Sequence, residues 1–194
     1  FLGDSICAGT TVLADAKEYG YGWGGLIGEA NKMLWKNYGR NGATVAPLSS
    51  VDQVRWIPYQ ADLAISAYPN ADYVIFDGGA NDAYGLGAEG IGTFSAIGYA
   101  PTSDADFTGA FETLILKILN AYPTAKVGYI IPPKIGPVDD HGSEGCVLRK
   151  FFDRAVEICQ KWGVPVLDLW NGNPLNPSLS VYYDSELTAD EANT

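Results

Sequence analysis

Three short clusters of glycine, asparagine and serine carry the residue types that could do chemistry in this 194-residue chain. They are Gly-Asp-Ser-Ile at 3–6, Asn-Tyr-Gly-Arg-Asn-Gly-Ala-Thr at 37–44 and Gly-Gly-Ala-Asn-Asp-Ala-Tyr-Gly at 78–85. Each cluster falls just after a segment that we predict to be a buried strand. The carboxyl ends of parallel strands share one edge of a sheet, where ligands bind in open α/β folds, so we expect the clusters to meet there.

Each cluster also has a purely structural interpretation. In Gly-Asp-Ser, either Asp4 or Ser5 could cap a helix that follows a strand. Asn-Gly and Gly-Gly pairs are common in ordinary turns. A single cluster therefore leaves both interpretations open, and only the combination of three favours a functional site.

In combination the clusters resemble the SGNH hydrolases, also called the GDSL family of esterases and lipases, and the resemblance runs through most of the chain. It implies that Ser5 is the nucleophile. It also implies that the backbone N–H of Gly42 and the side-chain amide of Asn81 donate hydrogen bonds to an oxyanion hole. The other residues that match the second and third blocks of the family are Asn37, Gly39, Thr44, Gly79 and Asp82.

The chemistry implied by the resemblance is hydrolysis of an ester through an acyl-enzyme. Attack on the carbonyl carbon places negative charge on one oxygen, which the N–H of Ser5, the N–H of Gly42 and Nδ2 of Asn81 would stabilise. Losing one such donor typically raises the barrier by about 2.7–4 kcal/mol. Because glycine has no Cβ, the backbone at Gly42 can approach a substrate closely. Neither a metal ion nor an organic cofactor is implied.

The resemblance breaks at the base that a nucleophilic serine needs. In the family this base is a histidine in a C-terminal Asp-x-x-His block, after the fifth strand. The single histidine of the chain, His141, follows the fourth predicted strand, so we expect a loop residue, with a substitute base as the alternative. In the tail, Asp184 has Leu187 at the histidine position and is assigned no catalytic role. We expect a chain trimmed at both ends, with the histidine beyond Thr194; the rival is a binding domain that has lost its base.

The cysteines offer a second candidate nucleophile. Cys7, Cys146 and Cys159 are too few and too odd in number for a disulfide framework, and they lack the spacing of metal ligands. Buried free thiols are therefore expected. Cys7 is close to Ser5 and could be nucleophilic, but no basic residue stands beside it in sequence to lower its pKa.

Alternating apolar runs and amphipathic stretches predict βα units around a parallel sheet. We expect strands within 1–5, 32–37, 72–79, 125–133 and 164–170. Apolar residues at three- and four-residue steps predict helices over 104–123 and 146–163, with weaker signals over 22–31 and 59–68. The predicted fold is a single three-layer α/β/α domain over 1–194, with a flavodoxin-like parallel sheet of about five strands.

The segment 83–105 is rich in Gly, Ser and Ala and has no periodicity, which predicts a long loop after the third strand. Long loops in compact domains are often functional. Three aromatic residues of this loop, Tyr84, Phe94 and Tyr99, could stack on a sugar together with Trp23. Ordinary packing is the alternative role for these side chains.

Composition limits the partners. A net charge of −11 argues against nucleic acid and against anionic membrane surfaces. No apolar run approaches the about 20 residues that cross a bilayer. The predicted substrate is a small-molecule or carbohydrate ester with a small acyl group, as for a carbohydrate acetylesterase, with lysophospholipid and thioester hydrolysis as alternatives within the family. Oligomeric state, and a cytoplasmic or secreted location, are left open.

Overall fold

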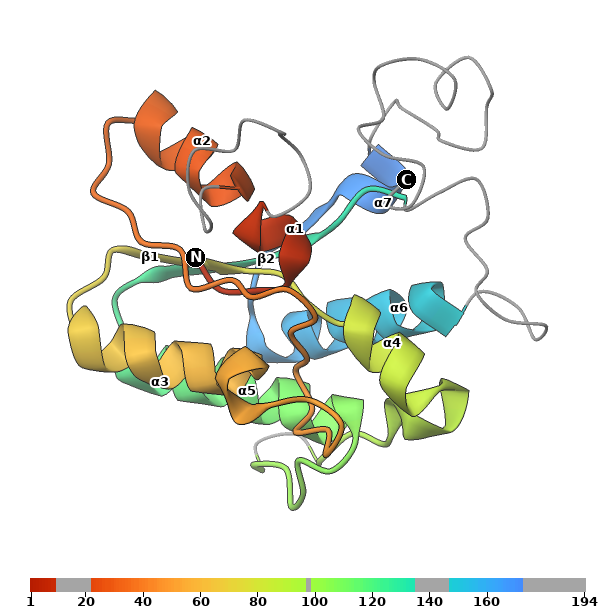
Figure 1. Cartoon of the computed structure of the whole chain (residues 1–194). Helices are drawn as coiled ribbons and strands as arrows, with labels where there is room; N and C mark the ends of the chain where they lie inside the picture. The colour runs from red at the N-terminus through yellow and green to blue at the C-terminus, as the bar shows by residue number, and fades with distance from the viewer. Residues whose placement is uncertain (10–21, 97–98, 135–146, 173–194) are drawn as a thin grey trace, which may run out of the picture.

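A parallel β-sheet of three strands lies at the centre of the chain (Figure 1). The computed structural model describes residues 1–9, 22–96, 99–134 and 147–172. The strands, in spatial order, are β1 (Tyr73–Phe76), β2 (Lys126–Ile131) and β3 (Val166–Asp168). Both pairs are parallel, with Val74 opposite Val127 and Tyr129 opposite Val166. These are the third, fourth and fifth strands that the sequence predicts.

The first two predicted strands do not form regular strands, so the described residues give three strands where about five were expected. Leu2 makes only an isolated parallel bridge to Phe76. A helix begins at Ser5, only three residues after this bridge, and so ends the extended segment. The prediction of a strand over 32–37 is also wrong, since these residues form no regular strand.

Backbone hydrogen bonds nevertheless place both segments where a flavodoxin-like sheet requires them. The N–H of Leu2 donates to the carbonyl of Ile75 at 3.1 Å, which holds 1–3 beside β1. The N–H of Tyr38 donates to the carbonyl of Phe1 at 2.9 Å, which holds 36–40 beside 1–3. The resulting order, 36–40, 1–3, β1, β2, β3, is the flavodoxin-like order that the fold prediction named.

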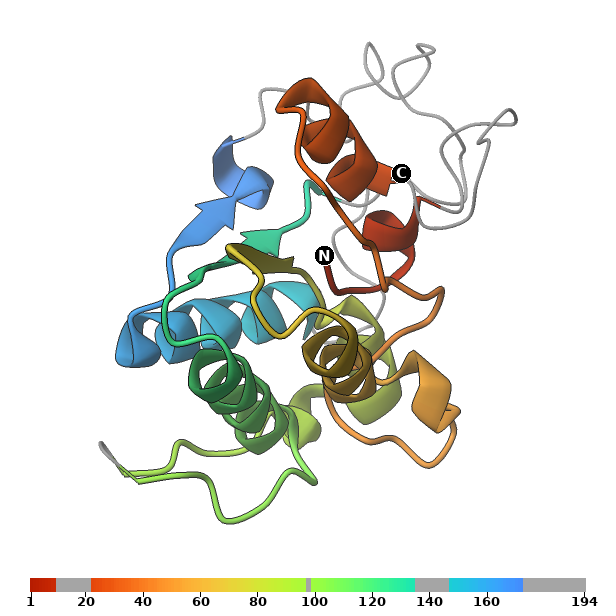
Figure 2. The ribbon, with the colours of Figure 1, turned by 90° about the vertical axis from the view of Figure 1, so that its left-hand side faces the viewer.

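Helices cover both faces of the sheet, which confirms the predicted α/β/α fold class (Figures 1 and 2). On one face lie α1 (Ser5–Ala8) and α2 (Gly22–Ala30). On the other lie α3 (Ile57–Ala67), α4 (Ala80–Leu86), α5 (Phe107–Ala121) and α6 (Val147–Trp162). The short α7 (Leu169–Gly172) follows β3 directly, and the 3₁₀ helices are η1 (Gln53–Arg55) and η2 (Ala88–Ile91).

The four predicted helices are all present, and their ends follow from local chemistry. Asp106 caps α5, accepting a hydrogen bond from the N–H of Gly109 at 2.7 Å. The helix ends one residue before Tyr122, because Pro123 cannot continue it. Beyond α6, Gly163 adopts a left-handed φ of 71°, the usual conformation for ending a helix.

The two periodic apolar stripes, on α5 and α6, form the core together with the sheet. Aromatic rings dominate it: the ring of Phe76 lies 5.8 Å from that of Phe111, and the ring of Phe107 lies 4.8 Å from that of Phe151. All four side chains are fully buried. The prediction that these stripes are core faces is thereby confirmed. Within the described ranges, no helix combines the length and apolarity needed to cross a bilayer.

The predicted loop over 83–105 is wrong in its first part. Residues 83–86 belong to α4 and residues 88–91 to η2. Tertiary contacts override the weak helix propensity of this glycine-rich stretch. Ala83 is buried, and the missing Cβ of Gly85 leaves room for the side chain of Leu48, which a Cβ would meet at 2.4 Å. Among the described residues of this stretch, those at 92–96 and 99–105 form no helix.

Candidate active site

Ser5 is the first residue of α1, at a tight corner between the sheet edge and a one-turn helix. Asp4 caps this helix, and its Oδ1 accepts a hydrogen bond from the N–H of Ile6 at 2.9 Å. The structural interpretation of Asp4 is therefore confirmed. Gly9 ends the turn with a left-handed φ of 70° and donates its N–H to the carbonyl of Ser5.

A buried glutamine fixes the backbone just before Ser5. Gln60 of α3 accepts a hydrogen bond from the N–H of Gly3 at 2.8 Å and donates Nε2 to the carbonyl of Gly3 at 2.9 Å. The amide thus pairs with both polar groups of one peptide residue, as a neighbouring strand would. Gly3 itself has a φ of 155°, and an added Cβ would lie 1.8 Å from Oδ1 of Asp77. The corner therefore requires glycine at this position.

Asp77, at the end of β1, holds the same corner from the other side. Its Oδ1 accepts a hydrogen bond from the N–H of Asp4 at 3.0 Å, and its Oδ2 accepts one from Nε1 of Trp23 at 3.1 Å. Burial, followed by the nearby charge of Asp4, raises the pKa of the Asp77 carboxyl well above its usual value. The residues around Ser5 are thus held by α2, α3 and β1 together.

The second cluster is tied to the first through Asn37. Its Nδ2 donates to the carbonyl of Cys7 at 2.6 Å, while its Oδ1 accepts hydrogen bonds from Sγ of Cys7 and from the N–H of Gly39. A further bond runs from the N–H of Arg40 to the carbonyl of Gly3 at 3.0 Å. The asparagine of the second block therefore joins two of the three clusters.

The third cluster is tied to the second through the start of α4. Nδ2 of Asn81 donates to the carbonyl of Ala43 at 2.9 Å. The carboxylate of Asp82 accepts hydrogen bonds from the N–H of Val45 at 2.9 Å and from the N–H of Ala46 at 2.7 Å. All three clusters are consequently joined by direct hydrogen bonds, as the parallel-sheet argument predicts.

Ser5, Gly42 and Asn81 are each partly exposed. Their neighbours Asp4, Ala43 and Asp82 are buried. Gly42 has a left-handed φ of 70°, a backbone conformation that favours glycine. The side-chain amide of Asn81 has two N–H donors, of which one is bonded to Ala43, so the other can serve a ligand. The groups proposed from the sequence are thus accessible on one rigid framework.

Two further buried carboxyl groups beside this framework have raised pKa values. Burial raises the pKa of Asp4 to about 6, although the hydrogen bond from Ile6 opposes this shift. Burial raises the pKa of Asp82 to about 7, against the opposing hydrogen bonds from Ala46 and Val45. In each case the loss of hydration outweighs the bonds that favour the charged form.

These carboxyl groups predict a stability that depends on pH. Because the folded chain holds the Asp82 proton more tightly than the unfolded chain, the free energy of unfolding falls as pH rises from about 4 to about 7. Asp82 alone contributes up to about 4 kcal/mol to this fall. Urea unfolding at a series of pH values should show a flatter profile for Asp82→Asn than for the wild type.

The matched control for this prediction is Asp62→Asn, because Asp62 is an exposed carboxylate that pairs with Lys117. This variant should keep the slope of the wild-type profile. An Asp82→Asn profile as steep as that of the wild type would contradict the assignment.

The structure argues against a cysteine nucleophile. Cys7 is fully buried, and its Sγ lies 3.2 Å from Oδ1 of Asn37. Burial, followed by the charge of Asp77, raises the pKa of Cys7 well above its usual value, so the thiolate is disfavoured. Cys159 is also buried and free, and its pKa is raised to about 12 by burial. The prediction of buried free thiols is confirmed for both.

Several residues singled out in the sequence lie outside the described part of the chain: Cys146, His141, Asp184 and the rest of the tail after Gly172.

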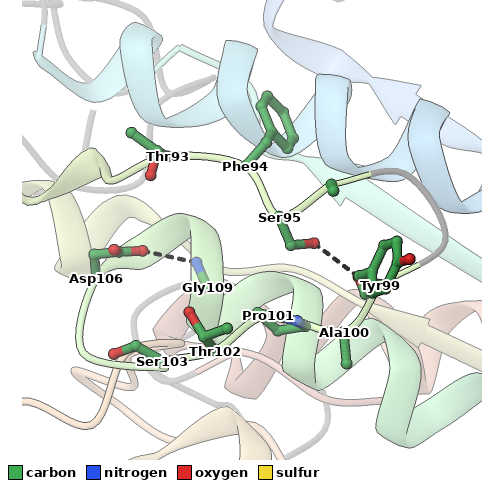
Figure 3. Close-up of a pocket in the computed structure, with 11 residues that line it drawn as sticks. Thr93, Phe94, Ser95, Tyr99, Ala100, Pro101, Thr102, Ser103, Asp106 and Gly109 are labelled. Carbon is green, nitrogen blue, oxygen red and sulfur yellow. Dashed lines mark hydrogen bonds between the residues drawn. The ribbon is translucent and has the colours of Figure 1, made fainter.

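Of the four aromatic residues that were predicted to stack on a sugar, Trp23 lies beside the Ser5 corner through its bond to Asp77. Tyr84 is exposed on α4, three residues after Asn81 and hence on the same helix face. Phe94 and Tyr99 line a separate cavity (Figure 3).

Gln60 and Asp77 are parts of the site that were not predicted from the sequence. A signal for Asp77 was present, since it is a charged residue at the end of an apolar strand, next to Gly78. Gln60 gave no such signal, because its role depends on a contact 57 residues away in sequence.

Within residues 1–9, 22–96, 99–134 and 147–172, no group of three or more His, Cys, Asp or Glu side chains could hold a metal ion.

Comparison with solved structures gives several matches to the whole fold. A protein from Lactobacillus plantarum is 20% identical, with a TM-score of 0.69 over 94% of this chain and 81% of that one. Est24, a carbohydrate acetylesterase from Sinorhizobium meliloti, is 17% identical, with a TM-score of 0.60 over 88% and 82% of the two chains. The acetyl xylan esterase AlAXEase is 17% identical, with a TM-score of 0.57 over 97% and 84%. At these identities the likeness shows the fold alone.

A comparison with curated proteins finds no match. The model of the GDSL-like lipase/acylhydrolase family, however, matches residues 1–187, which is nearly the whole chain. The match covers all three clusters that the hydrogen bonds of Asn37, Asn81 and Asp82 join. The chain belongs to the GDSL-like lipase/acylhydrolase family of hydrolases.

Proposed function

We propose that this chain is a serine ester hydrolase that acts on small acyl esters, with Ser5 as its nucleophile. The observation that carries the proposal is that hydrogen bonds join the three family blocks to one another. Within these joined blocks, Ser5, Gly42 and Asn81 are partly exposed. Family membership supports hydrolysis as the type of reaction.

In the proposed reaction, Oγ of Ser5 attacks the carbonyl carbon of the ester, and its proton passes to a histidine base that is not among the described residues. The N–H of Ser5, the N–H of Gly42 and Nδ2 of Asn81 donate to the oxyanion that forms. Because Ser5 is the first residue of its helix, its N–H has no acceptor within that helix. The tetrahedral intermediate then collapses, the alcohol leaves with a proton, and water hydrolyses the acyl-enzyme.

We further propose that the substrate is an acetylated carbohydrate. Two proteins with the same fold are named as an acetyl xylan esterase and a carbohydrate acetylesterase. Exposed Tyr84 shares a helix face with Asn81 and offers an aromatic surface beside the proposed oxyanion hole. A sugar ring can pack its C–H face on such a surface while its hydroxyl groups stay hydrated.

The test compares acyl chain lengths and leaving groups. The full-length protein should hydrolyse p-nitrophenyl acetate with a higher kcat/KM than the butyrate or octanoate ester, and it should release acetate from acetylated xylan. Faster turnover of the octanoate ester, of a lysophospholipid or of an acyl thioester would contradict the acetylesterase assignment. Acetate release no faster than that of Ser5→Ala would instead identify a non-catalytic binding domain.

A further inference from the structure

A cavity of about 360 Å³ lies between residues 93–96 and 99–103 on one side and the start of α5 on the other (Figure 3). The described residues of this wall, 93–96 and 99–103, pass beneath the helical layer that holds α3 and α5, on the side away from the sheet and α1 (Figures 1 and 2). The cavity is therefore separate from the Ser5 corner. Its volume falls within the range of about 300–1,000 Å³ that is usual for small-molecule pockets.

A buried carboxylate holds one wall of the cavity in place. The side chain of Glu112 is fully buried, and its Oε2 accepts a hydrogen bond from the N–H of Ser95 at 3.1 Å. Its Oε1 accepts bonds from Nε1 of Trp162 and from Lys161. Nζ of Lys161 also donates to the carbonyl of Ser95 at 2.9 Å. The ion pair between Glu112 and Lys161 thus holds Ser95, a loop residue, in a fixed position.

A second cation, Arg154, contacts the residues just before Ser95. The guanidinium of Arg154 lies 4.6 Å from the ring centre of Phe94, and its Nη1 donates to the carbonyl of Gly92 at 2.8 Å and to Oγ1 of Thr108 at 2.9 Å. Both cations, Arg154 and Lys161, come from α6 and lie behind the loop rather than in the cavity. The wall is consequently preorganised, which lowers the entropic cost of binding a ligand.

The residues that line the cavity are part polar and part apolar, and the carboxylate of Asp106 is the one charged group among them. Thr93, Thr102, Ser103 and Asp106 gather at one end of the cavity, and Tyr99 lies at the other (Figure 3). Oδ1 of Asp106 is used by the N–H of Gly109, so its second oxygen can accept a bond from a ligand. The side chain of Tyr99 is 70% exposed. No lysine or arginine is among the lining residues.

From this lining we propose that the cavity binds a neutral oligosaccharide. Sugar hydroxyl groups match the hydroxyl and carboxylate groups at the polar end, and the ring of Tyr99 offers a face for stacking. An anionic ligand would meet Asp106 and the net charge of −11 with no lining cation to offset them. An apolar ligand would leave the hydroxyl groups without partners. The site goes beyond the proposed esterase activity and does not depend on it.

Isothermal titration of the full-length wild type with unacetylated xylohexaose and cellohexaose tests the proposal. Saturable binding of at least one of these sugars is expected, with Tyr99→Ala weakening it about tenfold or more. Tyr68→Ala is the matched control, because Tyr68 is also an exposed tyrosine, 50% accessible, at the end of α3. This control should bind as the wild type does.

Two outcomes would overturn the proposal: no binding of either sugar, or equal affinity for wild type and Tyr99→Ala. A loss of affinity in Tyr84→Ala but not in Tyr99→Ala would place the sugar near Asn81 instead, and would also overturn it. Hydrolysis of p-nitrophenyl acetate, measured on the same variants, should be unchanged in Tyr99→Ala. This hydrolysis assay therefore measures the esterase activity independently of sugar binding in the cavity.

Discussion

Ser5→Ala is expected to lower kcat for p-nitrophenyl acetate by about 10⁴-fold or more, to near the background rate. Without Oγ no acyl-enzyme can form, whereas the oxyanion donors and the binding surface remain. Because Ser5 is only partly buried and the change removes a single oxygen atom, thermal unfolding of the variant should match that of the wild type. Steady-state kinetics and a melting curve on the same sample measure both effects.

Cys7→Ala is the matched control, since Cys7 lies on the same one-turn helix as Ser5. Its thiol is fully buried and its pKa is raised by burial, so removing it should leave kcat within a fewfold of the wild type. The opposite pattern, with Ser5→Ala active and Cys7→Ala inactive, would make the chain a cysteine enzyme and contradict the proposal.

Asn81→Ala is expected to lower kcat by about 10²–10³-fold, with a much smaller change in KM. The reason is that the second N–H of Nδ2 would meet negative charge only in the transition state, so its loss raises the barrier more than it weakens substrate binding. The first N–H holds the carbonyl of Ala43 at 2.9 Å, and its loss should cost about 1 kcal/mol of stability. Kinetics below the melting temperature separate these two effects.

The control for this prediction is Asn31→Ala. Asn31 also donates Nδ2 to a backbone carbonyl, that of Ile27 at 2.8 Å, but at an exposed site just after α2. This variant should keep both kcat and KM. A wild-type kcat in Asn81→Ala would remove Asn81 from the proposed oxyanion hole.

Local patterns predicted the helices well because their signals are local. The apolar stripe from Phe107 to Tyr122, the cap at Asp106 and the stop at Pro123 all lie within one stretch, and α5 follows them. The first two strands were predicted less well, since Leu2 makes only an isolated bridge to Phe76 before a helix begins at Ser5. Glycine-rich α4 was missed because burial against Leu48 and the core, rather than propensity, favours that helix.

The clusters of the site could be predicted, but the groups that position them could not. The position of a residue just after a strand, as for Ser5 and Asn81, is visible in the sequence. By contrast, the pairing of Gln60 with Gly3 joins residues 57 apart, and the bond from Trp23 to Asp77 joins residues 54 apart. Such contacts depend on how the helices pack on the sheet, which the order of residues does not state.

Covalent labelling of the full-length protein with a fluorophosphonate tests the central claim most directly, because this reagent forms a stable adduct with an activated serine. Intact-mass measurement and peptide mapping should find one adduct, on the peptide that carries Ser5. Ser5→Ala should remain unlabelled. An unlabelled Ser5, or an adduct carried by another residue while Ser5→Ala still hydrolyses p-nitrophenyl acetate, would contradict the account.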